Sequence, residues 1–150
     1  MTRIPGYLRP VSIPDVAARP NVHVEVRIEG APRVFDVHFL IDTGADDTIL
    51  HPRDVPPRIA SLLASSFDDH PEGRQIGGVG GGGYIIPVTA RLSFRTDTGA
   101  GRIWHDARVW VARPTDANRR LPSLLGRDLL QHFRLTVDYE ADPPVLLERP

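Results

Sequence analysis

The chain has 150 residues, with 18 basic against 19 acidic side chains and no cysteine. This length suits one domain with a sizeable core, and the balanced charge shows no basic stripe for nucleic-acid binding. The lack of cysteine excludes disulfides, zinc–thiolate sites and thiol nucleophiles. No apolar run approaches the ~18 residues of a membrane span, so we expect a soluble, cytoplasmic protein without membrane or nucleic-acid partners.

The 15 prolines and 13 glycines, with few long helical patterns, favour a β-rich fold with many turns. Residues 1–20 carry four prolines and little periodicity, which predicts an irregular N-terminal arm ahead of one domain over residues 21–150. Residues 22–28 alternate apolar and polar side chains, the period of a half-buried strand. A turn over residues 29–33 then leads to a second strand at residues 34–41.

The second strand runs straight into an acidic segment, whose sequence is Asp42-Thr43-Gly44-Ala45-Asp46-Asp47. An acid at the end of a buried strand is unusual because taking its charge out of water is costly. Thr43 can donate a hydrogen bond, and Gly44 permits a tight turn in which backbone amides approach the carboxylate. The segment is thus suited to hold Asp42 on a rigid floor with its oxygens facing outward. The alternative is a plain strand end with Asp42 as a turn residue.

A short strand is expected at residues 48–52 and one or two helical turns at residues 56–63, where proline is tolerated at the start. Residues 75–88 follow, with six glycines in the seven positions from 77 to 83. Their spacing fits G-x-G-x-x-G, but β-formers and a proline follow where a dinucleotide loop needs a helix. We therefore predict a β-hairpin whose glycine tip acts as a lid, with an ordinary surface loop as the alternative.

Two further strands are predicted at residues 88–94 and 103–111. The connector between them holds a second Asp-Thr-Gly at residues 97–99, preceded by polar residues instead of a buried strand end. Asp97 is therefore interpreted as a turn residue. Near the C-terminus, a short helix is expected from the spacing of Leu129, Leu130 and Phe133, followed by strands at 134–139 and 145–148.

Three motifs stand in one order: the apolar run into Asp42-Thr43-Gly44, the glycine-rich hairpin, and Leu124-Leu125-Gly126-Arg127 before a helix. In order, spacing and flanking residues, this resembles the retropepsin-like aspartic proteases, meaning the retroviral proteases and their cellular and bacterial relatives, over roughly residues 22–140. The resemblance implies an all-β fold with one or two short helices. It also implies a closed or partly open β-barrel of the acid-protease type, with one lobe per chain.

The resemblance also assigns roles to residues. Asp42, Thr43 and Gly44 would form the catalytic triplet, and the hairpin would be a flap that closes over a bound peptide. Gly126 and Arg127 would give structural support, with Leu124–Gly126 beside Asp42 and Arg127 paired with Asp46. The residues that it implies for substrate binding are Ala45, Asp46, Asp47, Gly77, Gly78, Val79, Gly80, Leu124 and Leu125.

Peptide hydrolysis by carboxylates needs two of them sharing a proton, one to activate water and one to protonate the carbonyl oxygen. The chain supplies one such acid, Asp42. A symmetric homodimer would bring Asp42 and its copy together, and the pair would titrate as a unit. We therefore expect an aspartic endopeptidase that acts on extended peptides as a homodimer and needs neither a metal nor an organic cofactor.

Other functions find less support. The six histidines lack metal-ligand spacing such as H-E-x-x-H, and the chain lacks the G-x-S-x-G elbow of serine hydrolases. The remaining alternative is a binding module of the same fold, which would dimerise and grip extended peptides by strand addition without cutting them.

Overall fold

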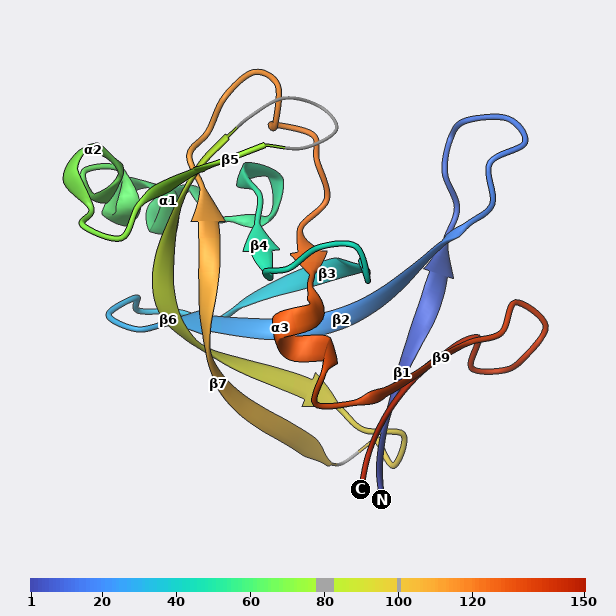
Figure 1. Cartoon of the computed structure of the whole chain (residues 1–150). Helices are drawn as coiled ribbons and strands as arrows, with labels where there is room; N and C mark the ends of the chain where they lie inside the picture. Colours follow the sequence, from blue (N-terminus) through green and yellow to red (C-terminus); the bar gives the residue numbers. More distant parts are fainter. Residues whose placement is uncertain (78–82, 100) are drawn as a thin grey trace.

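The computed structural model describes residues 1–77, 83–99 and 101–150. These residues form mainly β-strands, with a few short helical segments (Figure 1). The expected all-β fold with short helices is therefore confirmed. No helix within these ranges is both long and apolar enough to cross a membrane.

The strands, in chain order, are β1 (Thr2–Arg9), β2 (Arg19–Ile28), β3 (Phe35–Ile41), β4 (Ile49–Leu50), β5 (Arg74–Ile76), β6 (Gly83–Arg95), β7 (Arg102–Ala112), β8 (Leu124–Leu125), β9 (Arg134–Val137) and β10 (Val145–Arg149). The helical segments are η1 (Pro52–Asp54), α1 (Pro57–Leu63), α2 (Ser66–Asp69) and α3 (Arg127–Leu130).

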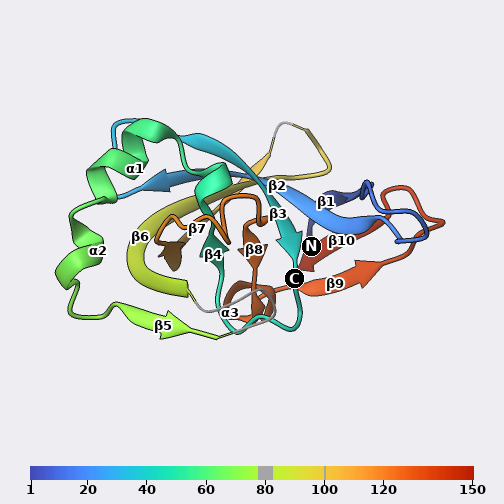
Figure 2. The same cartoon turned by 90° about the horizontal axis from the view of Figure 1, so that it is seen from above.

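Six of the strands close into a barrel, as expected. Their order is β6-β7-β4-β8-β3-β2, and β2 pairs back with β6 to complete the ring. The short β8 lies between β3 and β4, parallel to the first and antiparallel to the second (Figure 2). The position of β8 brings the residues after β3 and the residues after β8, which are far apart in sequence, to the same end of the barrel.

The alternation that predicted β2 also determines which side chains fill the barrel. Val22, Val24 and Val26 point inward and are fully buried, whereas Arg27 is exposed. Other large and fully buried side chains include Phe39, Leu50, Ile86, Leu92, Phe94 and Leu125. Each side chain of this size contributes about 1.5–3 kcal/mol by leaving water, so the barrel interior is a major source of hydrophobic stabilisation.

The prediction of an irregular arm over residues 1–20 is wrong for residues 2–9, which form β1, and for residues 19–20, which begin β2. Residues 2–6 pair with β10 and residues 7–9 pair with β2, so Pro5 faces only one partner strand and its missing N–H is tolerated. Gly6 stands at the switch, where an added Cβ would lie 2.4 Å from the carbonyl oxygen of Asn21. Proline and glycine, which made the segment look irregular, thus permit the strand to change partners.

The two chain ends lie together on a small sheet beside the barrel (Figure 1). In it β10 lies between β1 and β9 and is antiparallel to both. The predicted C-terminal hairpin is confirmed, and its partner is the N-terminal segment. Residues 10–18 connect β1 to β2 without strand or helix.

Candidate active site

Asp42 follows directly on β3 and is held by backbone contacts. Its N–H donates to the carbonyl of Leu125 at 3.0 Å, and the N–H of Gly44 donates to its Oδ1 at 2.9 Å. The N–H of Ala45 closes the turn on the Asp42 carbonyl at 3.2 Å. The side chain of Asp42 is half-buried, so its carboxylate is fixed by the turn and still reachable from solvent.

The floor beneath Asp42 is the pairing of β3 with β8. Leu40 lies opposite Leu124, and Ile41 lies opposite Leu125, in parallel register. The predicted placement of Leu124–Gly126 beside Asp42 is therefore confirmed. Leu125 is fully buried, so it supports the floor from the core, whereas Leu124 is only half-buried.

Two glycines of this site, Gly126 and Gly44, have little room for a side chain. A Cβ on Gly126 would lie 2.4 Å from the carbonyl oxygen of Asp47 and 3.1 Å from that of Ala45, both backbone atoms that cannot easily move. A Cβ on Gly44 would lie 3.2 Å from Oδ1 of Asp42. A side chain at Gly126 would push the acidic segment away from β8, whereas one at Gly44 would crowd the Asp42 carboxylate.

A buried polar network holds the acidic segment to α3. Thr48 is fully buried; its hydroxyl donates to Oδ1 of Asp128 at 2.7 Å, and its N–H donates to Oδ2 at 3.0 Å. The N–H of Gly126 donates to the same hydroxyl at 3.1 Å. The sequence reasoning missed the role of Asp128, because its partner lies 80 residues away and no local pattern links them.

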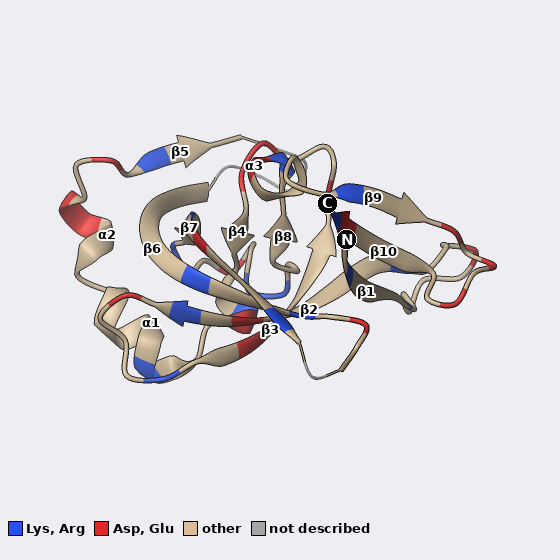
Figure 3. Cartoon of the chain, turned by 90° about the horizontal axis from the view of Figure 1, so that it is seen from below, with Lys and Arg blue, Asp and Glu red and all other residues tan. Residues whose placement is uncertain are grey.

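The two acids after the triplet each pair with an arginine. Arg127, at the start of α3, pairs with Asp46 as expected, and it also donates to the Thr43 carbonyl at 3.3 Å. Figure 3 shows acidic and basic parts of the backbone close together around α3. The side chains of Arg127 and Asp46 are 57% and 79% exposed, so their pair contributes only about 0–1 kcal/mol to stability. Its role is to fix the acidic segment locally.

Asp47 pairs with Arg74 at the start of β5. The guanidinium of Arg74 also lies over the ring of Trp110, 4.2 Å from its centroid. Strands β5 and β6 are antiparallel, with Ile76 opposite Gly83, so the base of the predicted hairpin is confirmed. Gly77 is exposed at its end, whereas Gly78, Val79 and Gly80 lie outside the described residues.

The second Asp-Thr-Gly is a turn, as predicted. Asp97 lies between β6 and β7, where the N–H of Gly99 donates to the Thr96 carbonyl at 3.1 Å and Gly99 has a φ of 74°. The carboxylate of Asp97 is 3.7 Å from the guanidinium of Arg3, on β1. Within residues 1–77, 83–99 and 101–150, no group of three or more acidic or histidine side chains is placed to hold a metal ion.

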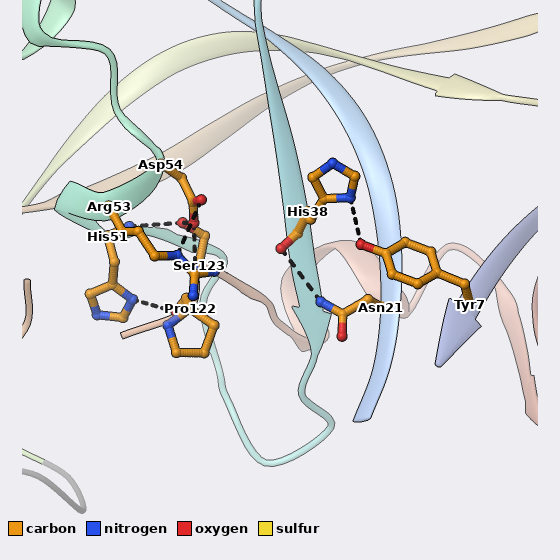
Figure 4. A network of polar contacts seen from close by, with 8 residues as sticks. All are labelled: Tyr7, Asn21, His38, His51, Arg53, Asp54, Pro122 and Ser123. Carbon is orange, nitrogen blue, oxygen red and sulfur yellow. Dashed lines mark hydrogen bonds and ion pairs between the residues drawn. The ribbon is translucent and has the colours of Figure 1, made fainter. Parts of the chain in front are cut away.

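A second network braces the floor from the side of η1 (Figure 4). Ser123 is fully buried; its hydroxyl donates to Asp54 at 2.7 Å, and it accepts from the N–H of His51 at 3.0 Å. Nδ1 of His51 donates to the Pro122 carbonyl at 2.7 Å, and burial lowers the pKa of this imidazole. Sequence reasoning had assigned no role to these residues.

The sequence model of the family described as retroviral aspartyl protease matches residues 16–138. The match covers most of the chain, including Asp42, the acidic segment and α3. The chain belongs to the retroviral aspartyl protease family. No curated protein sequence matches the chain.

Membership in the retroviral aspartyl protease family confirms the resemblance inferred from the three motifs. It places the chain, at the level of the family, among hydrolases of the aspartic protease type. The matched region begins at residue 16, so β1 lies outside it. Strand β10 lies beyond the end of the match at residue 138, so only β9 of the terminal sheet lies within the part that matches the retroviral aspartyl protease family.

Proposed function

We propose that the chain is an aspartic endopeptidase that cleaves extended peptides, and that its active form is a homodimer with one Asp42 from each subunit. The observation that carries the proposal is the carboxylate of Asp42, which is fixed by the Gly44 N–H and remains half-exposed at the barrel end. A carboxylate in this position is oriented before substrate arrives, as acid–base catalysis requires.

The need for a second subunit follows from the chemistry. Two carboxylates must share a proton, so that the ionised one takes a proton from water while the other protonates the carbonyl oxygen. Asp46 and Asp47 are both occupied by arginines, and Asp97 lies in a turn paired with Arg3. A two-fold axis passing close to Asp42 would supply the missing acid from an identical surface.

The substrate would lie between the acidic segment and the β5–β6 hairpin. In this arrangement Ala45, Asp46, Asp47 and the half-buried Leu124 form the lower side, and Gly77 begins the upper side. We assign Gly78, Val79 and Gly80 to substrate binding from the family resemblance alone. Leu125 would take part through the floor that it forms, since its side chain is fully buried.

The test is turnover of an unfolded protein substrate by the native chain and by Asp42→Asn. Asn is nearly isosteric and can still accept the Gly44 N–H, so the fold should persist while cleavage is lost. Asp97→Asn is the matched control and should cleave at close to the native rate. Cleavage by Asp42→Asn at the native rate would refute the proposal; peptide binding without any cleavage by the native chain would favour a binding module instead.

A further inference from the structure

A pocket of about 240 Å³ opens beside the site, and four arginines line it. Arg9 and Arg19 come from β1 and β2, Arg53 from η1, and Arg120 from the segment before β8. Leu40 and Pro122 contribute apolar parts of the wall. We call this the arginine pocket.

The positive charge in the arginine pocket is largely uncompensated. Arg9 and Arg19 lie directly opposite each other in the β1–β2 pairing, where like charges repel and destabilise the sheet. Among the described residues, no acid forms an ion pair with Arg9, Arg19 or Arg120. An anion bound between them would relieve this repulsion.

Arg53 is only partly compensated. Its ion pair with Asp54 is 3.4 Å long, and the same carboxylate also accepts hydrogen bonds from the hydroxyl and the N–H of Ser123 (Figure 4). The charge of Arg9 also acts on His38, which lies outside the pocket lining. Burial is the main cause of the lowered pKa of His38, with His23 and then Arg9 acting in the same direction.

The position of the arginine pocket links it to Asp42. Leu40 precedes Asp42 by two residues along the β3 direction, so both side chains face the same way, about 7 Å apart. Pro122 precedes Leu124 by two residues, and Leu124 lies opposite Leu40. A peptide extended across Asp42 would therefore bring one of its side chains to the mouth of this pocket.

We infer that the arginine pocket selects an acidic side chain, Asp or Glu, at a substrate position close to the bond that is cleaved. This inference rests on the proposed peptidase function, whose substrate preference it specifies. Arginine suits the role because its planar guanidinium donates two parallel hydrogen bonds to one carboxylate. Four guanidinium groups around one small pocket would repel a basic side chain and would bind a neutral one only weakly.

The test uses peptide pairs that differ only by Glu against Gln at each position flanking the cleaved bond. At one position the native chain should cleave the Glu peptide with a kcat/KM about tenfold higher, the effect of one charge-assisted hydrogen bond. In Arg9→Gln/Arg120→Gln this ratio should fall toward one. Arg95→Gln, which removes an exposed arginine outside the pocket, should keep it. Raising the salt concentration should reduce the native ratio.

A binding measurement separates this inference from the proposed function. Fluorescence anisotropy with labelled Glu and Gln peptides on Asp42→Asn reports the pocket without turnover. If no peptide is cleaved but the Glu peptide binds more tightly in an Arg9- and Arg120-dependent way, the peptidase proposal fails and the acid preference stands. Cleavage with equal rates for Glu and Gln at every position overturns the inference and leaves the peptidase intact. If Arg9→Gln/Arg120→Gln in the Asp42→Asn background dimerises more weakly while its ratio of Glu-peptide to Gln-peptide affinity is unchanged, the inference is also overturned, since the arginines would then bind the partner copy.

Discussion

At the scale of single residues, the site depends on places where a side chain would not fit. Gly126 is the sharpest case, because the space that a Cβ would take is filled by backbone atoms of Asp47 and Ala45. Gly126 also donates to the buried hydroxyl of Thr48, so moving it disturbs the Thr48–Asp128 contact as well. The apolar-apolar-Gly pattern is therefore a packing requirement of the site.

Gly126→Ala should lower the free energy of unfolding by about 1–3 kcal/mol, as overpacking of a well-filled site does. It should also reduce peptide cleavage, since the acidic segment must shift away from β8. Urea unfolding and kcat/KM measure the two effects. Gly77→Ala is the control for stability, because an added Cβ there meets nothing within 4 Å. Equal stability of Gly126→Ala and the native chain would show that the backbone at Asp47 can move to make room for the added Cβ without loss of stability.

At the scale of elements, the β5–β6 hairpin is joined to the acidic segment by one side chain. Arg74 contacts Asp47 with its charge and Trp110 with its face, so it connects β5, the acidic segment and β7. The β5–β6 pairing itself covers only the three residues of β5. A short strand with few ladder hydrogen bonds needs such a contact to keep its position.

Arg74→Ala should leave the overall stability within about 1 kcal/mol of the native value, because the lost contacts are largely exposed. The hairpin should nevertheless open more often, which raises KM for peptides and speeds hydrogen exchange of the β5 amides. Arg91→Ala is a matched control, since Arg91 also has an acidic partner, Asp106, and lies over a tryptophan, Trp104. Unchanged exchange in Arg74→Ala would show that the hairpin is held by other contacts.

At the scale of the whole molecule, activity should require two chains. Mixing native chains with an excess of Asp42→Asn chains should reduce the activity per native chain, because mixed dimers carry only one catalytic acid. Specific activity should also fall on dilution through the dimer dissociation constant. Activity that stays proportional to the native chain in such mixtures would mean that one chain suffices.

The fold should also lose stability in mild acid. Burial lowers the pKa of His51, His38 and His105 from their ordinary value of 6.5, so below that pH the unfolded chain binds more protons than the folded one. The free energy of unfolding should therefore be highest above about pH 6.5 and fall as the pH drops through the folded-state pKa values. Unfolding by urea between pH 8 and pH 5 measures this slope.

His51→Asn should make that slope shallower, because Asn keeps a donor near the Pro122 carbonyl and cannot take up a proton. The free energy of unfolding of His51→Asn at pH 8 measures the loss of packing. Its change from pH 8 to pH 5 measures the loss of titration. A native free energy of unfolding that is constant from pH 8 to pH 5 would contradict the assignment. The acidic side of any activity profile is thus expected to be limited by the fold as well as by the carboxylates.

The sequence alone predicted most of the strands from residue 22 onward, the turn at Asp97, the hairpin base and the segment that carries Asp42. Each of these rests on a local signal: alternation, turn residues, or a motif whose order and spacing match the family. It misjudged residues 2–9, where Pro5 and Gly6 argued against a strand that exists because β10 and β2 each accept part of it.

The contacts that support the site could not be predicted in this way, because they form only when the barrel closes. The Thr48–Asp128 and Asp54–Ser123 hydrogen bonds, the Asp47–Arg74 pair and the arginine pocket each join segments brought together by barrel closure. Periodicity reports how one segment divides its side chains between core and solvent. It does not report which distant segment will lie alongside, because that choice depends on the packing of the whole barrel.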